Sequence, residues 1–338
     1  MHAAANSLRG GVSPRRVRLR GQSIIEYVLI IAIIGLVIVF AGPGLAGAIR
    51  NQFNLVGNTV NSGTTGSVEG GASGGGSTGA DSATVQAAIA KDAKDWTLDE
   101  QKAVAEDIAA KGEASPVYAK AKAAMDAGTT WSIKLNDLHK SWLYDTMSYR
   151  IIGINHDDLA DGSGKAGLTF QAVNTIGTNS MMSKNTNIGG WEKSKLRQEM
   201  NSGEVWDLMP SELQSKVETV TKLTNNARGG WSSTNAPVTA TSDKLFLISY
   251  TEIAGNLAQY ESDSKFTWLF QEGDQYEAFK GKITDCGASN DSLKSDYEWW
   301  TRTISTVTDD CFEFIFKDGR FGGNPAIKGY GIRPAWCF

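Results

Sequence analysis

The sequence predicts an α+β protein in which an N-terminal apolar helix is joined by a linker to small helices and a mixed α+β C-terminal domain. Three observations support this prediction. Residues 27–49 form one uncharged and mostly apolar run. Residues 57–83 consist largely of Gly, Ser and Thr. All ten Trp lie after residue 95, so the large core that buries such side chains belongs to the C-terminal part.

The charge is modest overall but unevenly placed. The chain has 41% hydrophobic and 21% charged residues and a net charge of −4, which excludes a polybasic nucleic-acid binder and a wholly disordered chain. We therefore expect no nucleic-acid partner. The first 20 residues contain no acid and carry the basic residues Arg9, Arg15, Arg16, Arg18 and Arg20.

Residues 27–49 are long enough to cross a membrane, because about 20 apolar residues span a bilayer as a helix. The preceding arginines predict a cytoplasmic N-terminus by the positive-inside rule, so the chain after residue 50 is expected outside the cytoplasm. An ordinary secretory signal has a shorter apolar region of about 7–15 residues. Here Glu26 stands at the front edge of the run, where an ionisable residue usually has a specific partner.

The segment GQSIIEY, from Gly21 to Tyr27, stands directly before the apolar run and resembles the N-terminus of Flp-type (Tad) pilins, a branch of the type IV pilins. The resemblance implies that a prepilin peptidase cuts between Gly21 and Gln22. It also places Glu26 and Tyr27 at the Glu-Tyr positions that direct assembly with other pilin subunits. Residues 1–21 would then be a leader peptide and residues 22–56 a pilin-like transmembrane helix.

The implied cleavage would create a charge that can pair with Glu26. Cleavage exposes a new α-amine on Gln22, and that cation can neutralise Glu26 of a neighbouring subunit inside a helical bundle. An unpaired buried charge is strongly unfavourable, so only the docked register satisfies both groups. Typical Flp pilins are much shorter than 338 residues, so the resemblance favours a minor or adhesive subunit. A plain membrane anchor is the alternative.

Residues 57–83 have the composition of a flexible coil, and residues 84–128 are typical of a helical stalk. Thr97 and Glu100 have the spacing of a capping box, and Gly112 is expected to end the helix that they start. Ser115-Pro116 is expected to begin the next helix. We expect no ligand site in this segment.

Residues 129–338 are expected to form the main domain. Strands are expected at 149–154, 168–173, 245–249 and 312–316, and helices at 192–201 and 210–221. Several phrases in this part resemble a poorly characterised bacterial extracellular domain: YRIIGIN, WEKSKLR ending in Asn201, SDKLFLIS, WWTR and GIRPA. Met200 and Thr303 depart from the usual Leu and Ser of that pattern. The terminal GIRPA is also similar to the sulfatase-modifying-factor branch of the C-type-lectin-like fold, which implies a lectin-like extracellular head.

The aromatic residues allow two interpretations. Trp191, Trp299 and Trp300 are candidates for a surface that binds a glycan or a protein, but large aromatic side chains more often fill a core, and we favour the core. Arg302 and Arg333 lie in apolar surroundings, where structural pairing with a carboxylate or with carbonyl groups is the favoured interpretation.

Three cysteines in an exported domain suggest one disulfide and one thiol. If 311–316 and 331–337 pair as antiparallel strands, Cys311 lies near Cys337, which is the pairing that we favour, and Cys286–Cys311 is the alternative. The loop from His156 to Gly164 is acidic but lacks the alternating calcium ligands, so we expect a solvated turn.

We find no zinc spacing and no nucleophile–base pair, and we expect no catalytic residue, metal or cofactor. The sequence thus predicts a Tad/Flp-type pilus subunit. Its precursor would cross the cytoplasmic membrane once with the N-terminus inside, and its assembled form would display the head at the cell surface. The alternatives are a membrane-anchored domain that does not polymerise and an extracellular enzyme related to the lectin-like modifying factors.

Overall fold

The computed structural model describes residues 82–138, 144–226, 238–255, 271–305 and 308–338. The predicted processing and assembly residues Gly21, Gln22, Glu26 and Tyr27, and with them the predicted transmembrane segment, lie outside the described residues. Among the helices that are described, none combines the length and the apolar character that a membrane crossing requires. The described part is a mixed α+β fold with several sheets, as the sequence predicts.

Three helices follow one another at the start of the described chain: α2 (Ala83–Ala90), α3 (Leu98–Lys111) and α4 (Tyr118–Asp126). The capping box at the start of α3 is confirmed, because Thr97 Oγ1 accepts from the Glu100 amide and the Glu100 carboxylate accepts from the Thr97 amide at 2.7 Å. Gly112 ends α3 as predicted with a φ of 59°, a conformation that favours glycine. Pro116 does not start α4, which begins at Tyr118.

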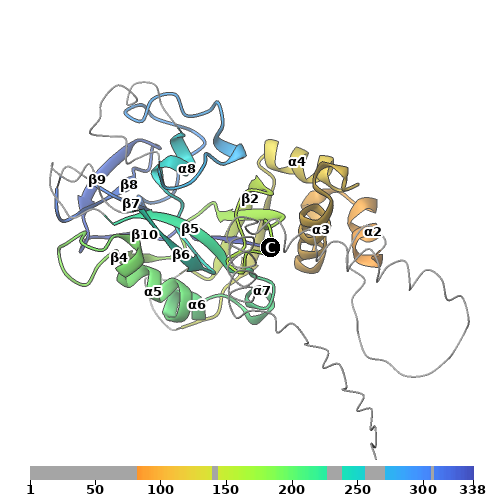
Figure 1. Cartoon of the computed structure of the whole chain (residues 1–338), viewed down its shortest axis with the longest axis horizontal. Coiled ribbons are helices and arrows are strands. Elements are labelled where there is room, and N and C mark those ends of the chain that lie inside the picture. The colour runs from red at the N-terminus through yellow and green to blue at the C-terminus, as the bar shows by residue number, and fades with distance from the viewer. Residues whose placement is uncertain (1–81, 139–143, 227–237, 256–270, 306–307) are drawn as a thin grey trace, which may run out of the picture. The chain divides into compact units, whose positions relative to one another are not determined.

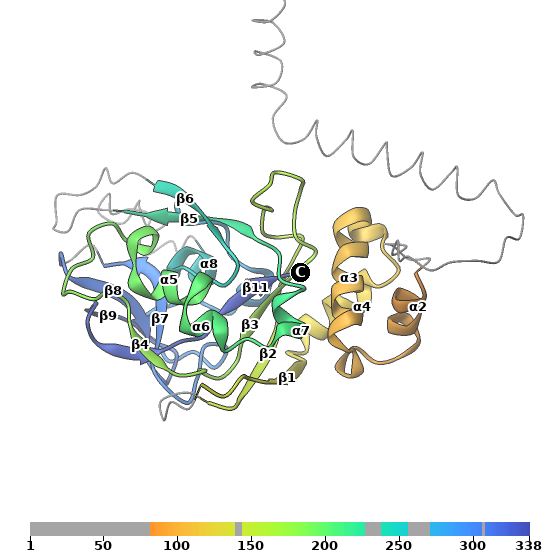
Figure 2. The same cartoon turned by 90° about the horizontal axis from the view of Figure 1, so that it is seen from below.

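A four-stranded antiparallel sheet lies beside these helices (Figures 1 and 2), in the order β1 (Thr130–Lys134), β2 (Thr146–Ile154), β3 (Leu168–Ala172) and β11 (Ala335–Cys337). One face carries an aromatic cluster in which Tyr149 lies 5.7 Å from Phe170 and 5.1 Å from Trp336, measured between ring centroids. Trp131 of the same cluster stacks on Trp96 at 6.4 Å, so the aromatic face packs against the helical layer.

A five-stranded sheet forms the other large layer, in the order β4 (Thr178–Ser180), β10 (Gly329–Gly331), β7 (Trp299–Ile304), β8 (Cys311–Ile315) and β9 (Phe321–Pro325). Only β10 and β7 run parallel. Every residue of β7 is buried, because this strand lies in the middle of the sheet and both of its faces are covered. A third sheet contains β5 (Val220–Asn225) and β6 (Val238–Asp243).

Short helices connect the sheets. They are α5 (Lys195–Ser202), α6 (Glu204–Asp207), α7 (Ser211–Gln214) and α8 (Tyr250–Ala254), with single 3₁₀ turns at Trp191–Lys193 and Glu277–Phe279. The helix expected at 192–201 is confirmed in its main part by α5. The helix expected at 210–221 is reduced to α7, since the chain already runs as β5 from Val220.

The strand expected at 245–249 is a buried extended segment rather than a ladder strand. It forms an isolated bridge between Phe246 and Ala335, and the Ile248 carbonyl accepts a single backbone hydrogen bond from Arg302 of β7 at 3.2 Å. The reason lies in the next residues: Ser249 caps α8 with Glu252 in a second capping box, so the chain turns into a helix before a ladder can form.

Candidate functional site

The three tryptophans proposed as a ligand surface lie in the core. Trp191, Trp299 and Trp300 are each 0% exposed. Their indole N–H groups are used internally: Trp191 Nε1 donates to Asp243 Oδ2 at 2.9 Å, and Trp300 Nε1 donates to the Asn179 carbonyl at 2.9 Å. The proposed ligand surface is therefore wrong, and the core interpretation explains these residues.

The expected disulfide between Cys311 and Cys337 is also wrong. Cys311 lies in β8, which pairs with β7 and β9, whereas Cys337 lies in β11, which pairs with β3 in the other large sheet. The alternative partner Cys286 is a free thiol as well, and all three cysteines are buried. Burial raises the pKa of Cys286 to about 12 and that of Cys311 to about 11, so these thiols are poor nucleophiles at neutral pH.

A cluster of buried charges, which we call the ion cluster, joins five parts of the fold. It consists of Asp157, Lys222, Glu252, Glu272 and Arg302. Lys222 Nζ lies 2.5 Å from Asp157 Oδ1 and also contacts Glu252, and Arg302 Nη1 lies 2.5 Å from the other oxygen of Glu252. These side chains are at most 3% exposed, so the ion pairs are held in a medium of low dielectric.

Opposite charges dominate the electrostatics of the cluster. Burial alone would raise the pKa of Asp157, but the ammonium of Lys222 holds it well below its ordinary value. Burial likewise opposes ionisation of Glu252, and the guanidinium of Arg302 lowers the pKa of that carboxyl. For Glu272 burial prevails, and its pKa is raised. The cluster therefore contains ions that stabilise one another.

The ion cluster is closed by further hydrogen bonds. Tyr276 donates its hydroxyl to Asp157 at 3.0 Å, and Thr169 donates to the same carboxylate at 2.6 Å. These contacts tie the β2–β3 loop, β3 and β5 to α8 and β7. The acidic loop at 156–164 predicts a solvated turn, but Asp157 at its start is only 3% exposed. We interpret the ion cluster as a structural feature that holds these elements together, and not as a reaction centre.

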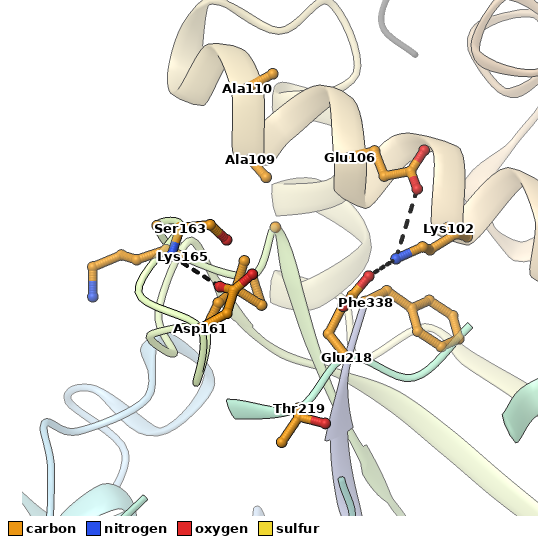
Figure 3. Close-up of a pocket in the computed structure, with 14 residues that line it drawn as sticks. Lys102, Glu106, Ala109, Ala110, Asp161, Ser163, Lys165, Glu218, Thr219 and Phe338 are labelled. Carbon is orange, nitrogen blue, oxygen red and sulfur yellow. Dashed lines mark hydrogen bonds and ion pairs between the residues drawn. The ribbon is translucent and has the colours of Figure 1, made fainter. Parts of the chain in front are cut away.

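A pocket that is open to solvent is lined by residues other than those of the ion cluster. A cavity of about 610 Å³ separates α3 from the loop between β2 and β3 (Figure 3). The loop backbone lies directly on the helix at one edge, because a Cβ added to Gly167 would lie 1.8 Å from the Ala105 carbonyl oxygen. The lining combines small side chains with charged ones: Lys102, Glu106, Ala109, Ala110, Leu159, Asp161, Ser163, Gly164, Lys165, Ala166, Gly167, Glu218, Thr219 and Phe338.

Charged residues of this pocket form ion pairs, and one of these pairs crosses from α3 to the segment before β5. Lys102 extends from α3 to contact Glu218 and lies 3.6 Å from Glu106, as Figure 3 shows. At the opposite edge, Lys165 Nζ lies 3.0 Å from Asp158 Oδ1. The lining offers carboxylate acceptors, ammonium donors and small side chains, which suits a ligand rich in hydroxyl or amide groups.

The sequence did not predict this pocket. Its side chains come from α3, from the β2–β3 loop and from the segment before β5, so no local pattern brings them together. The composition of the loop predicts a solvated turn and no ligand site. Among the residues that the structure describes, no group of His, Cys, Asp or Glu side chains has the arrangement of a metal site.

Comparison with known proteins gives one match. The family model described as "Domain of unknown function (DUF6273)" matches residues 163–338. No curated protein and no solved structure gives a significant match. The matched segment begins inside the loop that borders the pocket and includes β3 to β11.

Proposed function

The chain belongs to the DUF6273 family, and on that premise we propose that it displays a DUF6273 head outside the cell on a Tad/Flp-type pilin stem. The observation that carries the proposal is the spacing of Gly21, Glu26 and Tyr27 directly before the apolar run 27–49. A prepilin peptidase would release residues 22–338, and the stem would join other pilin subunits. The Gly/Ser-rich residues 57–83 would let a large head project from the filament.

The structure supports the part of the proposal that concerns the head. It has a large buried core, and the charges of its ion cluster are paired within the fold, which suits a domain that must persist outside the cell. We propose a C-type-lectin-like head whose pocket between α3 and the β2–β3 loop takes an extracellular glycan. The charged residues would meet sugar hydroxyl groups, and the small residues of the lining would leave room for a ring.

The thiols argue against the enzyme alternative. A cysteine-dependent enzyme needs an accessible thiolate, whereas Cys286 and Cys337 are buried and the pKa of each is raised.

The mature N-terminus tests the stem. We expect mass spectrometry of the protein from its native cell to find a chain that begins at Gln22, with no intact Met1. The variant Glu26→Ala should abolish recovery of the protein in sheared filaments, because the buried amine of Gln22 loses its counter-charge.

The matched control is Glu106→Ala, which removes a partly exposed carboxylate of the head and should leave filament recovery unchanged. An intact N-terminus would refute processing. Cleavage without recovery of the wild type in sheared filaments would instead favour the membrane-anchored domain that does not polymerise, and equal recovery of Glu26→Ala and the wild type would refute the role given to Glu26 in assembly.

A further inference from the structure

Two arginines approach the same short loop from different strands. Arg150 of β2 donates from Nη2 to the Ser292 carbonyl at 3.0 Å, and Arg333, just before β11, donates from Nη1 to the Leu293 carbonyl at 3.4 Å. Arg333 is 2% exposed, and Arg150 is half-buried. The two guanidinium groups are therefore anchored on consecutive carbonyls and are both largely removed from water.

Aromatic rings surround the two cations. The guanidinium of Arg333 lies 4.4 Å from the ring centre of Trp299, and that of Arg150 lies 5.8 Å from the ring centre of Phe279. Such contacts provide some stabilisation but no formal negative charge.

Neither arginine has the counter-ion that a buried cation normally has. Within the described ranges, neither guanidinium forms an ion pair with a carboxylate, in contrast to Arg302. Asp296 favours the charge of Arg333 from a distance, but this exposed carboxylate is already bound by Ser295 Oγ at 3.0 Å. Burial and the neighbouring charge of Arg150 lower the pKa of Arg333 to about 9.

A buried amide lies beside the arginines. Gln171 of β3 is opposite Arg150 in β2 and opposite Ala335 in β11, and directly opposed residues point to the same face of a sheet. Gln171 is 0% exposed, and neither its Nε2 nor its Oε1 has a hydrogen-bond partner in the described part of the chain. The Nε–H of Arg150 is also buried and without a partner there.

We propose that Arg150, Gln171 and Arg333 form a binding site for a small inorganic anion, chloride in the first place. The unpaired N–H donors of Arg150 and Gln171 would bind the anion, and the two guanidinium groups would supply the positive charge. A singly charged, weakly hydrated ion suits a site this buried, because a multiply charged anion would lose far more hydration energy on entry. The ion would join β2, β3 and β11 to the loop at 292–293, independently of what the head binds.

Thermal unfolding of the full chain in mild detergent tests the site. Chloride is replaced by gluconate at constant ionic strength, so that general salt screening stays the same. Once chloride exceeds its Kd, each tenfold increase should raise the unfolding midpoint by about 3–5 °C. The same midpoint in chloride and in gluconate would overturn the proposal.

Two variants assign the effect to the site. Arg150→Gln and Gln171→Met should each remove the chloride dependence, whereas Arg320→Gln, at an exposed arginine, should retain it. Loss of the dependence in Arg320→Gln as well would show that the ion acts through the general surface charge.

A structural measurement does not depend on the folding of any variant. Crystals of the wild-type protein soaked in bromide should show an anomalous peak within hydrogen-bond distance of Arg150 Nε and Gln171 Nε2. A water molecule in that position, with no anomalous signal, would overturn the proposal.

Discussion

Replacing Lys222 by Met is the most direct test of the ion cluster. Methionine keeps an apolar side chain of similar length but removes the ammonium that lies between Asp157 and Glu252. Glu252 retains Arg302 as its partner, whereas Asp157 retains only neutral donors. Removal of one partner of a buried ion pair costs about 3–5 kcal/mol. We expect a loss of that size in the free energy of unfolding at pH 7.

The loss should depend on pH, and its sign follows from Asp157. In the wild type, Lys222 overcomes burial and lowers the pKa of Asp157, so this carboxylate stabilises the fold above its unfolded pKa of 3.8, and the contribution is lost as the pH falls. Without the ammonium, burial prevails and raises that pKa, so the variant loses stability as the pH rises. The difference between the two proteins should therefore grow from pH 4 to pH 7.

Urea unfolding followed by tryptophan fluorescence measures this difference, because all ten Trp lie in the part of the chain after residue 95. Lys122→Met is the matched control: it removes an exposed lysine paired with Asp126 and should leave stability close to that of the wild type. Adding Asp157→Asn to Lys222→Met should restore much of the loss, since no uncompensated charge is left at that position. A loss below about 1 kcal/mol, or one that is equal at pH 4 and pH 7, would refute the role given to the cluster.

Two further predictions concern the pocket and the loop beside it. Lys102→Ala should weaken binding in a glycan array probed with the processed protein, whereas Lys122→Ala should not, and equal binding by both variants would exclude the pocket. Partial burial of His156 lowers its pKa, but its contact with Glu277 and the nearby carboxylates of Asp157 and Glu252 more than offset this and raise the pKa above 6.5. Its stabilisation is thus complete below pH 6.5 and is lost at higher pH, so His156→Gln should destabilise the fold more at pH 5.5 than at pH 9, as measured by urea unfolding.

Local signals in the sequence were sufficient where one segment determines its own structure. Thr97 and Glu100 predicted the start of α3 because a capping box needs only four consecutive residues. The apolar run YRIIGI predicted β2 for the same reason. By contrast, the ion cluster joins Asp157 to Arg302 through Lys222 and Glu252, residues that are far apart in the sequence. The apolar surroundings of Arg302 predict that it pairs with a carboxylate, but no local pattern identifies Glu252 as that partner.

The structure confirms the favoured core interpretation of the tryptophans and rejects the favoured disulfide, and both outcomes depend on where the strands are placed in the fold. Adjacent Trp299 and Trp300 point to opposite faces of a strand, and a strand with one solvated face would expose one of them. β7 has no solvated face, so both are buried. The disulfide between Cys311 and Cys337 required both strands to lie in one sheet, and the strand sequences do not encode which of two sheets each strand joins.

The structure also bears on where the folded head begins. The family match starts at residue 163, yet β3 inside the match pairs with β2 outside it, from Tyr149↔Ala172 to Ile154↔Leu168. A fragment that started at residue 163 would lack Asp157 and would leave Lys222 with one buried carboxylate fewer. It would also uncover the aromatic face of β3, which β2 and the helices now cover. Since Tyr149 Oη in turn donates to Gln101 of α3 at 3.2 Å, the helices belong to the same folded unit, and the part of the chain that folds as the head extends well before the matched segment.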